Sequence, residues 1–162
     1  MGAIATALEF GQEYNRVGGV DGRFRLGRTH NLSFLAVASD HQDEPNGRVA
    51  GPVFELDFAR QPRNLSYSVS HSSIDPDFRT ETGLVPRVDI RRIDANVAYK
   101  WWPEGTLLSW GPSFAYLRNY NHAGELEDEQ FRGNVNFEFV RNLRFSGGGH
   151  PRTGALWRDQ FS

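Results

Sequence analysis

Residues 131–139 read Phe-Arg-Gly-Asn-Val-Asn-Phe-Glu-Phe, and this stretch decides the fold. Its odd positions hold three phenylalanines, a glycine and a valine, while its even positions hold an arginine, two asparagines and a glutamate. Successive side chains of a β-strand point to opposite faces. The stretch therefore predicts a strand with one apolar face and one strongly polar face. A strand of a soluble β-sandwich shows the same alternation, so the rest of the chain must distinguish the two folds.

The same alternation recurs along the whole chain, and no segment has a convincing helical period. It is plainest in residues 64–72, where Leu65, Tyr67 and Val69 alternate with serines. The predicted strands are 4–10, 20–26, 31–39, 49–59, 64–72, 89–102, 106–120, 131–139 and a weaker ninth, 143–149. They predict an all-β fold, an antiparallel up-and-down meander of about 8–9 strands. This β-barrel or barrel segment occupies residues 1–150, and residues 151–162 are predicted to form an irregular C-terminal tail.

The strand count limits how such a sheet can close. Nine up-and-down strands cannot close with antiparallel pairing alone, because the first and the last strand run in the same direction. Either the ninth strand does not form and eight strands close, or the chain belongs to a larger sheet with further strands. An open sheet would leave unpaired edges, which the hydrocarbon of a membrane does not tolerate.

The connections between the predicted strands alternate in length. Those after the second, fourth, sixth and eighth strands are short, and those after the odd-numbered strands are longer and more polar. In a meander this places the tight turns on one rim and the long loops on the other, as in outer-membrane barrels. Aromatic residues near strand ends fit an interfacial girdle. They are Trp101, Trp102, Tyr116, Tyr120 and Phe139.

We therefore expect a transmembrane β-barrel of the bacterial outer membrane, or a segment of a larger one, with outer-membrane lipid as a partner. It would serve transport or the binding of glycans or small solutes at the surface, without catalysis. The alternative is a soluble all-β binding module, lipocalin-like or a sandwich, whose aromatic rings fill an ordinary core.

Composition excludes several other classes. The 162 residues carry a net charge of -2, which argues against a general nucleic-acid binder, and they contain no cysteine for disulfides or thiolate metal sites. No apolar run approaches the ~20 residues that a membrane helix needs. The first residues lack the basic start and apolar centre of a signal peptide. Because an exported barrel needs such a signal, we interpret the chain as a segment of a longer protein.

The polar rows of the strands supply candidate residues for a lumen or a binding surface. These candidates are Arg23, Arg25, Glu55, Asp57, Asp94, Lys100, Arg132 and Glu138, with Asn96 beside them. Charges of both signs could guide solutes through a polar lumen. In a barrel of about eight strands the side chains nearly fill the interior, so ion pairs among these residues are the stronger expectation.

Catalysis, metal binding and a cofactor are not expected. Glu55 and Asp57 lie two residues apart on one face, at a separation that glycosidase carboxylates can have, but wet strand faces commonly carry such pairs. The histidines show no ligand spacing, and no phosphate-binding loop follows a strand and opens a helix. They lie at His30, His41, His71, His122 and His150.

Residues 74–92 form the most distinctive connection. Its charges are interrupted by Phe78, Leu84 and Val85, which predicts an ordered loop that folds back into a barrel mouth; the alternative is an ordinary surface loop. The candidate residues of this loop are Asp75, Asp77, Phe78, Arg79, Arg87, Asp89, Arg91 and Arg92.

Two motifs also carry a resemblance to a known family. Residues 75–79 (Asp-Pro-Asp-Phe-Arg) with 83–92 (Gly-Leu-Val-Pro-Arg-Val-Asp-Ile-Arg-Arg), and the earlier residues 14–24, resemble the C-terminal region of a bacterial family of unknown function. Full-length members of that family carry an N-terminal domain similar to family-nine carbohydrate-binding modules. The resemblance spans approximately residues 4–150 and implies an internal part of a large outer-membrane barrel, without the remaining strands and the N-terminal domain. It supplies no catalytic residues.

Overall fold

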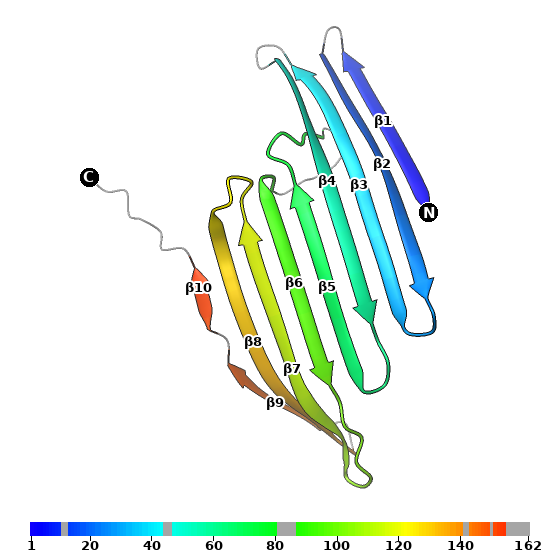
Figure 1. The fold of residues 1–162 in the computed structure, drawn as a ribbon, viewed down its shortest axis with the longest axis vertical. Helices are drawn as coiled ribbons and strands as arrows, with labels where there is room; N and C mark the ends of the chain where they lie inside the picture. Colours follow the sequence, from blue (N-terminus) through cyan, green and yellow to red (C-terminus); the bar gives the residue numbers. More distant parts are fainter. Residues whose placement is uncertain (11–12, 44–46, 81–86, 141–142, 150, 155–162) are drawn as a thin grey trace, which may run out of the picture.

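The computed structural model describes residues 1–10, 13–43, 47–80, 87–140, 143–149 and 151–154, which form a single curved β-sheet (Figure 1). The strands are β1 (Gly2–Phe10), β2 (Glu13–Leu26), β3 (His30–Asp43), β4 (Gly47–Arg60), β5 (Leu65–Ile74), β6 (Ile90–Tyr99), β7 (Leu107–Tyr120), β8 (Leu126–Phe139), β9 (Arg144–Gly149) and β10 (Arg152–Gly154). Among the described residues, no helix has the length and apolar character required to cross a membrane.

The sheet is an antiparallel meander, as the sequence predicts. Each strand from β1 to β8 pairs with the next one along the chain. Both β9 and β10 pair with β8, so together they form one interrupted edge strand. This edge continues through residues 152–154, where the sequence predicts an irregular tail; residues 155–162 lie outside the described part.

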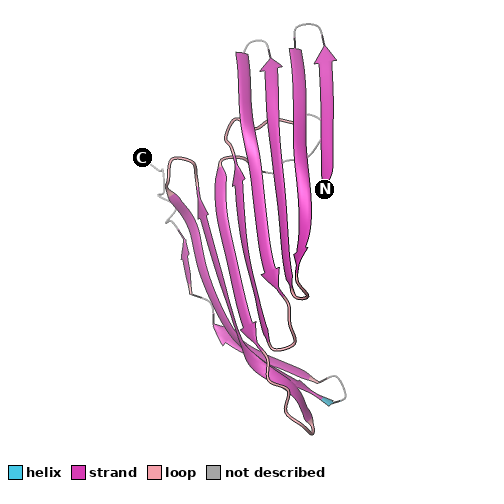
Figure 2. Cartoon of the chain, turned by 45° about the vertical axis from the view of Figure 1, so that its right-hand side comes forward, coloured by secondary structure: helices cyan, strands magenta, loops and turns pink. Residues whose placement is uncertain are grey.

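The sheet is open. The outer edge of β1 and the edge formed by β9 and β10 have no partner strand within the described part of the chain (Figure 2). Of the two alternatives for the strand count, closure by eight strands is therefore wrong for this chain, and the ninth strand is present. No second layer of structure covers either face of the sheet as a whole (Figure 2).

The predicted alternation of short and long connections is wrong. β1 ends at Phe10 and β2 begins at Glu13, and only the connection between β5 and β6 is long. The polar residues that resemble loops in the sequence instead extend the strands. Cross-strand ion pairs hold these extensions together, because Arg16 contacts Glu9 at 2.6 Å and Arg48 contacts Asp40 at 2.8 Å.

The pairing register divides the sheet into two faces. We call the apolar face the one that carries Phe34 of β3 and the residues that share its side of each neighbouring strand. Its large side chains remain exposed: Phe54 by 40%, Val97 by 41%, Phe114 by 59% and Phe137 by 36%. These exposed fractions mean that the face packs against no core within the described chain.

The first strand departs from the sequence pattern. The larger row of β1, with Ile4 and Leu8, pairs with Gly19 and Asn15 of β2, which lie on the opposite, polar face. The apolar face instead receives Ala3, Ala5 and Ala7 from β1. When both rows of side chains on a strand contain apolar residues, as in β1, the alternation does not determine which row lies on the apolar face.

Candidate functional site

The polar face gathers the residues that the sequence nominates. The register places Arg23, Arg25, Glu55, Asp57, Asp94, Arg132 and Glu138 on this one face. Lys100, just beyond β6, joins them because its Nζ lies 3.9 Å from Glu138. In the middle of the face β5 contributes Ser66, Ser68, Ser70 and Ser72, which lie opposite polar or small residues of β6.

Ion pairs neutralise much of the charge at two places on this face. Arg92 contacts Asp94 at 2.5 Å, and Glu138 accepts hydrogen bonds from Arg144 at 3.1 Å and from the Ser109 hydroxyl at 3.2 Å. Of the ion pairs expected among the candidate lumen residues, Lys100 with Glu138 is present, whereas Asp94 and Glu138 otherwise pair with Arg92 and Arg144, which lie outside that set. Arg92 therefore lies within β6 and not in the loop, and Arg91 lies beside it on the apolar face.

Glu55 and Asp57 do not form an isolated acidic pair. In the register Glu55 lies between Leu35 of β3 and Ser72 of β5, and Asp57 lies between Ser33 and Ser70. This setting is that of two carboxylates on a hydroxyl-rich strand face. Among the described residues, no group of three or more acidic or histidine side chains is arranged to hold a metal ion.

The described first part of the connection after β5 lies on the polar face and contacts three strands. We call this part, Asp75–Thr80, the strap. The Arg79 backbone N–H donates to the Ser39 hydroxyl of β3 at 3.0 Å, and the Arg79 carbonyl accepts from Asn15 Nδ2 of β2 at 3.2 Å. The Ser39 hydroxyl in turn donates to the Gly51 carbonyl of β4 at 3.3 Å. The prediction of a loop that folds back is thus confirmed for this part of the connection.

The strap makes the one sealed apolar contact of the described chain. Phe78 is only 5% exposed, and it and Val53 are the only hydrophobic residues that are buried among those described. Gly51 makes this contact possible, because a Cβ there would lie 2.4 Å from the Phe78 backbone nitrogen. The buried Ser39 and Asn15 complete the seat.

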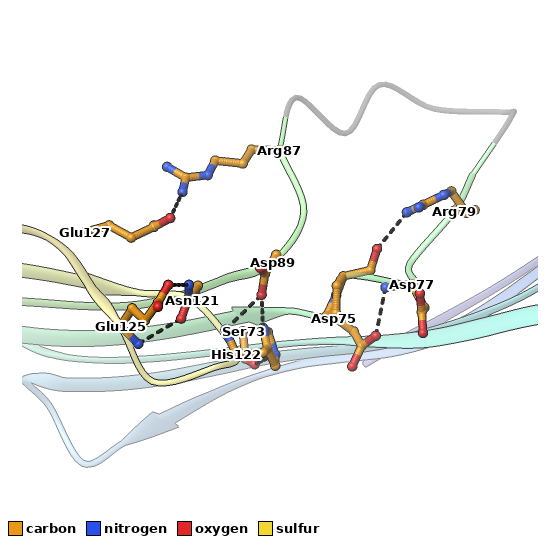
Figure 3. A network of polar contacts seen from close by, with 11 residues as sticks. Ser73, Asp75, Asp77, Arg79, Arg87, Asp89, Asn121, His122, Glu125 and Glu127 are labelled. Carbon is orange, nitrogen blue, oxygen red and sulfur yellow. Dashed lines mark hydrogen bonds and ion pairs between the residues drawn. The ribbon is translucent and has the colours of Figure 1, made fainter. Parts of the chain in front are cut away.

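The returning part of the connection is tied to the hairpin between β7 and β8 (Figure 3). Arg87 forms an ion pair with Glu127, and Asp89 Oδ1 accepts the His122 backbone N–H at 2.8 Å. The His122 ring also contacts Asp89, with Nδ1 3.0 Å from Oδ1, and its Nε2 lies 3.4 Å from the Ser73 hydroxyl. With the proton on Nδ1, the ring donates to Asp89 and accepts from Ser73.

Asp89 adopts a backbone conformation that few side chains take, with φ of 58°. In this left-handed conformation the carboxylate of a short side chain such as aspartate can bond locally. Here it reaches the amide of His122 instead, which connects two loops that are far apart in the sequence. The carboxylate of Asp75, in contrast, makes a local bond: its Oδ1 accepts the Asp77 backbone N–H at 2.9 Å.

The hydrogen bond from the His122 backbone lowers the pKa of the Asp89 carboxyl, and the bond from the His122 ring adds to this effect. Because the folded-state pKa is lowered, the contact stabilises the loop fully above the ordinary carboxyl pKa. This stabilisation is lost as the pH falls through the lower pKa of the folded state. We expect the carboxyl ¹³C resonance of Asp89 to titrate below that of a free aspartate. The titration should move part of the way toward the ordinary range in His122→Ala, which removes the ring and keeps the backbone N–H; an unchanged titration would contradict the ring contact.

Sequence reasoning missed the residues that seat the strap. Asn15, Ser39 and Gly51 look like ordinary members of polar or mixed strands. The apolar Phe78 within a charged loop was the available signal, and it indicated an anchor without indicating its partner. The strap's partners lie on β2, β3 and β4, so only the register brings them together.

In comparisons with known proteins, no family model, no curated protein and no solved structure matches this chain. The family resemblance in the two motifs therefore stays a prediction.

Proposed function

We propose that this chain forms part of the wall of a β-barrel in the bacterial outer membrane. The apolar face contacts lipid, and the polar face lines an aqueous interior that serves transport or the binding of small solutes or glycans, without catalysis. One observation carries the proposal: the uncovered apolar face is a band of nearly constant height that crosses the strands obliquely.

The upper limit of this band can be followed from strand to strand. On β8 and β7 the first charged residues on the apolar face are Glu129 and Arg118, which are register partners. The cross-strand partners of Arg118, taken from one strand to the next, form a line that ends at Gly22 on β2. The first charged residue on the apolar face of β2 is Arg16, six residues from Gly22. Averaged over the six strand spacings, the limit of the band shifts by about one residue per strand; on β3 and β4 it lies at Asp40 and Arg48, six and eight residues from the same line.

This shift gives the tilt of the strands in a membrane. Six residues correspond to about 20 Å along a strand, and six strand spacings correspond to about 29 Å, so the strands would tilt by about 35°. Membrane barrels tilt their strands by about 35–45°. The band spans residues 18–26 on β2 and 131–139 on β8, which corresponds to a height of about 25 Å after tilting, as such barrels show.

Interfacial residues flank the band on both sides. At its lower limit the rings of Tyr99, Trp101 and Trp110 pack together, with centroids 4.5 Å apart in each successive pair. At the upper limit Arg16 lies over Tyr14, at 4.7 Å from the ring centroid. Arginines and amphipathic rings favour the boundary between lipid and water.

A soluble binding module would need to bury these side chains. A sandwich core places apolar side chains between two packed sheets, whereas here the apolar face has nothing opposite it within the described chain. The long-loop argument from the sequence does not support the membrane, because the connections are not sorted by length. The oblique band supports the membrane independently of the loops.

The proposal predicts a folded state that survives detergent. The parent protein that contains this segment, refolded in detergent micelles or lipid vesicles, should migrate on a gel differently before and after boiling, because a closed barrel withstands the detergent until it is heated. Identical mobility before and after boiling, together with a monomer of normal size in buffer without detergent, would refute the membrane proposal and support the soluble module.

The resemblance to the carbohydrate-associated family enters the proposal as well. It supplies the remaining barrel strands and an N-terminal carbohydrate-binding domain as partners in the parent protein. The polar face suits neutral, hydroxyl-rich solutes, because serines and amides separate its two sets of ion pairs. Hydroxyl and amide side chains both donate and accept hydrogen bonds, as the hydroxyl groups of sugars require.

A further inference from the structure

We infer that the strap is a constriction of the aqueous passage and that Arg79 offsets the cation preference of the two carboxylates on the strap. This inference rests on the proposed function, since it requires water on the polar face. It concerns a different feature, namely what limits passage along that face and which ions are favoured there.

The position of the strap supports a constriction. Each of its seats on the sheet lies on the polar face: Gly51 on β4, Ser39 on β3 and Asn15 on β2. The strap therefore runs across the strands and not along them. A solute that moves along the strands on this part of the face has to pass over the strap.

The strap is fixed at this position by complementary contacts. The backbone N–H and carbonyl of Arg79 hydrogen-bond to the side chains of Ser39 and Asn15, which are both buried. Phe78 is buried above a glycine that leaves it no spare room. The returning part of the connection is held separately, by Arg87 with Glu127 and by Asp89 with His122.

The strap carries charges of both signs, the carboxylates of Asp75 and Asp77 and the guanidinium of Arg79. Arg79 is exposed, and its Nη1 donates to the carbonyl oxygens of Pro76 at 2.8 Å and Phe78 at 2.9 Å. These partners are neutral, so they orient the guanidinium without cancelling its charge. Charged side chains at a narrow point select ions by their sign, so Arg79 is the strap residue that favours anions, whereas Asp75 and Asp77 favour cations.

Gly51→Ala tests the constriction, with Gly18→Ala as the matched control. Both residues are strand glycines, but a Cβ at Gly18 meets nothing within 4 Å, whereas a Cβ at Gly51 meets the strap backbone. Single-channel conductance of the parent protein that contains this segment, measured in planar bilayers, should rise at least about twofold in Gly51→Ala and stay unchanged in Gly18→Ala, because conductance follows the narrowest cross-section. Ser39→Ala, which removes the acceptor of the Arg79 N–H, should raise it in the same direction without adding any atom.

Charge preference is read from the reversal potential in a salt gradient. Arg79→Gln should shift it toward cation preference, and Arg79→Lys should retain the preference of the wild type. Heat-dependent gel mobility confirms that each variant is folded.

The outcomes separate the two proposals. If the wild type conducts while the Gly51, Ser39 and Arg79 variants match it in conductance and in reversal potential, the constriction is refuted and the barrel proposal stands. If the wild type is silent and Gly51→Ala conducts, the strap closes the passage and the inference holds. If no variant conducts, the aqueous passage is refuted, and the constriction with it.

Discussion

Phe114→Arg is expected to prevent insertion into lipid vesicles and to abolish the heat-dependent gel shift. Phe114 lies near the middle of the apolar band on β7. It is 59% exposed, and among the described phenylalanines of that face only Phe145 is more exposed. An arginine on the lipid side at the membrane midplane costs about 2–4 kcal/mol. That cost is comparable to much of the stability of a small domain, so the folded fraction should fall sharply.

The neighbouring residue provides the matched control. Ser113 precedes Phe114 and points to the polar face, where the register places it opposite Asn134. Ser113→Arg adds the same side chain to the same strand, yet it should insert like the wild type because its guanidinium meets water. If the apolar face met water instead of lipid, replacing the exposed Phe114 by arginine would be harmless and the two variants would behave alike. Equal insertion of the two variants would therefore contradict a lipid-facing apolar band.

Gly111→Ala is expected to destabilise the sheet by about 3 kcal/mol or more, because overpacking against backbone cannot be relieved by a rotamer change. A Cβ at Gly111 would lie 1.8 Å from the carbonyl oxygen of Tyr99 and 3.1 Å from the Cα of Lys100. The obstructing atoms belong to the chain that leaves β6, next to the bridge between Trp101 and Trp110. The two strands would have to separate there, and the girdle rings would separate with them.

Gly133→Ala is the control for this prediction. Gly133 lies in β8, and a Cβ there would meet only ring carbons of Phe114, at an ordinary 3.6 Å. We expect its urea midpoint in lipid vesicles to stay close to that of the wild type, whereas the midpoint of Gly111→Ala should fall clearly. Similar midpoints for the two variants would show that the chain after β6 moves aside at little cost.

The sequence predicts the faces of the sheet better than its ends. In residues 131–139 apolar and polar side chains alternate without a break, and the register keeps the two rows apart as expected. The strand ends near Arg16 and Asp40 were missed because charges lie there on both faces, which removes the alternation. Those charges stabilise the strand extensions through cross-strand ion pairs that only the register reveals.

The strap illustrates a different limit of sequence reasoning. Phe78 could be recognised as an anchor from its apolar character within a charged loop. Its seat could not, because a glycine such as Gly51 indicates close approach of something without indicating what approaches. Ser39 and Arg79 are 40 residues apart, and their hydrogen bond follows from three-dimensional pairing alone.

The directions of the two free edges have a consequence for assembly. β1 and β9 run the same way, because eight antiparallel pairings separate them. If copies of this chain met edge to edge around a ring, every junction between neighbours would be a parallel one. Parallel ladders are slightly weaker per residue than antiparallel ladders. A ring of copies would therefore open first at these junctions. An odd number of further strands between neighbouring copies would make every pairing antiparallel.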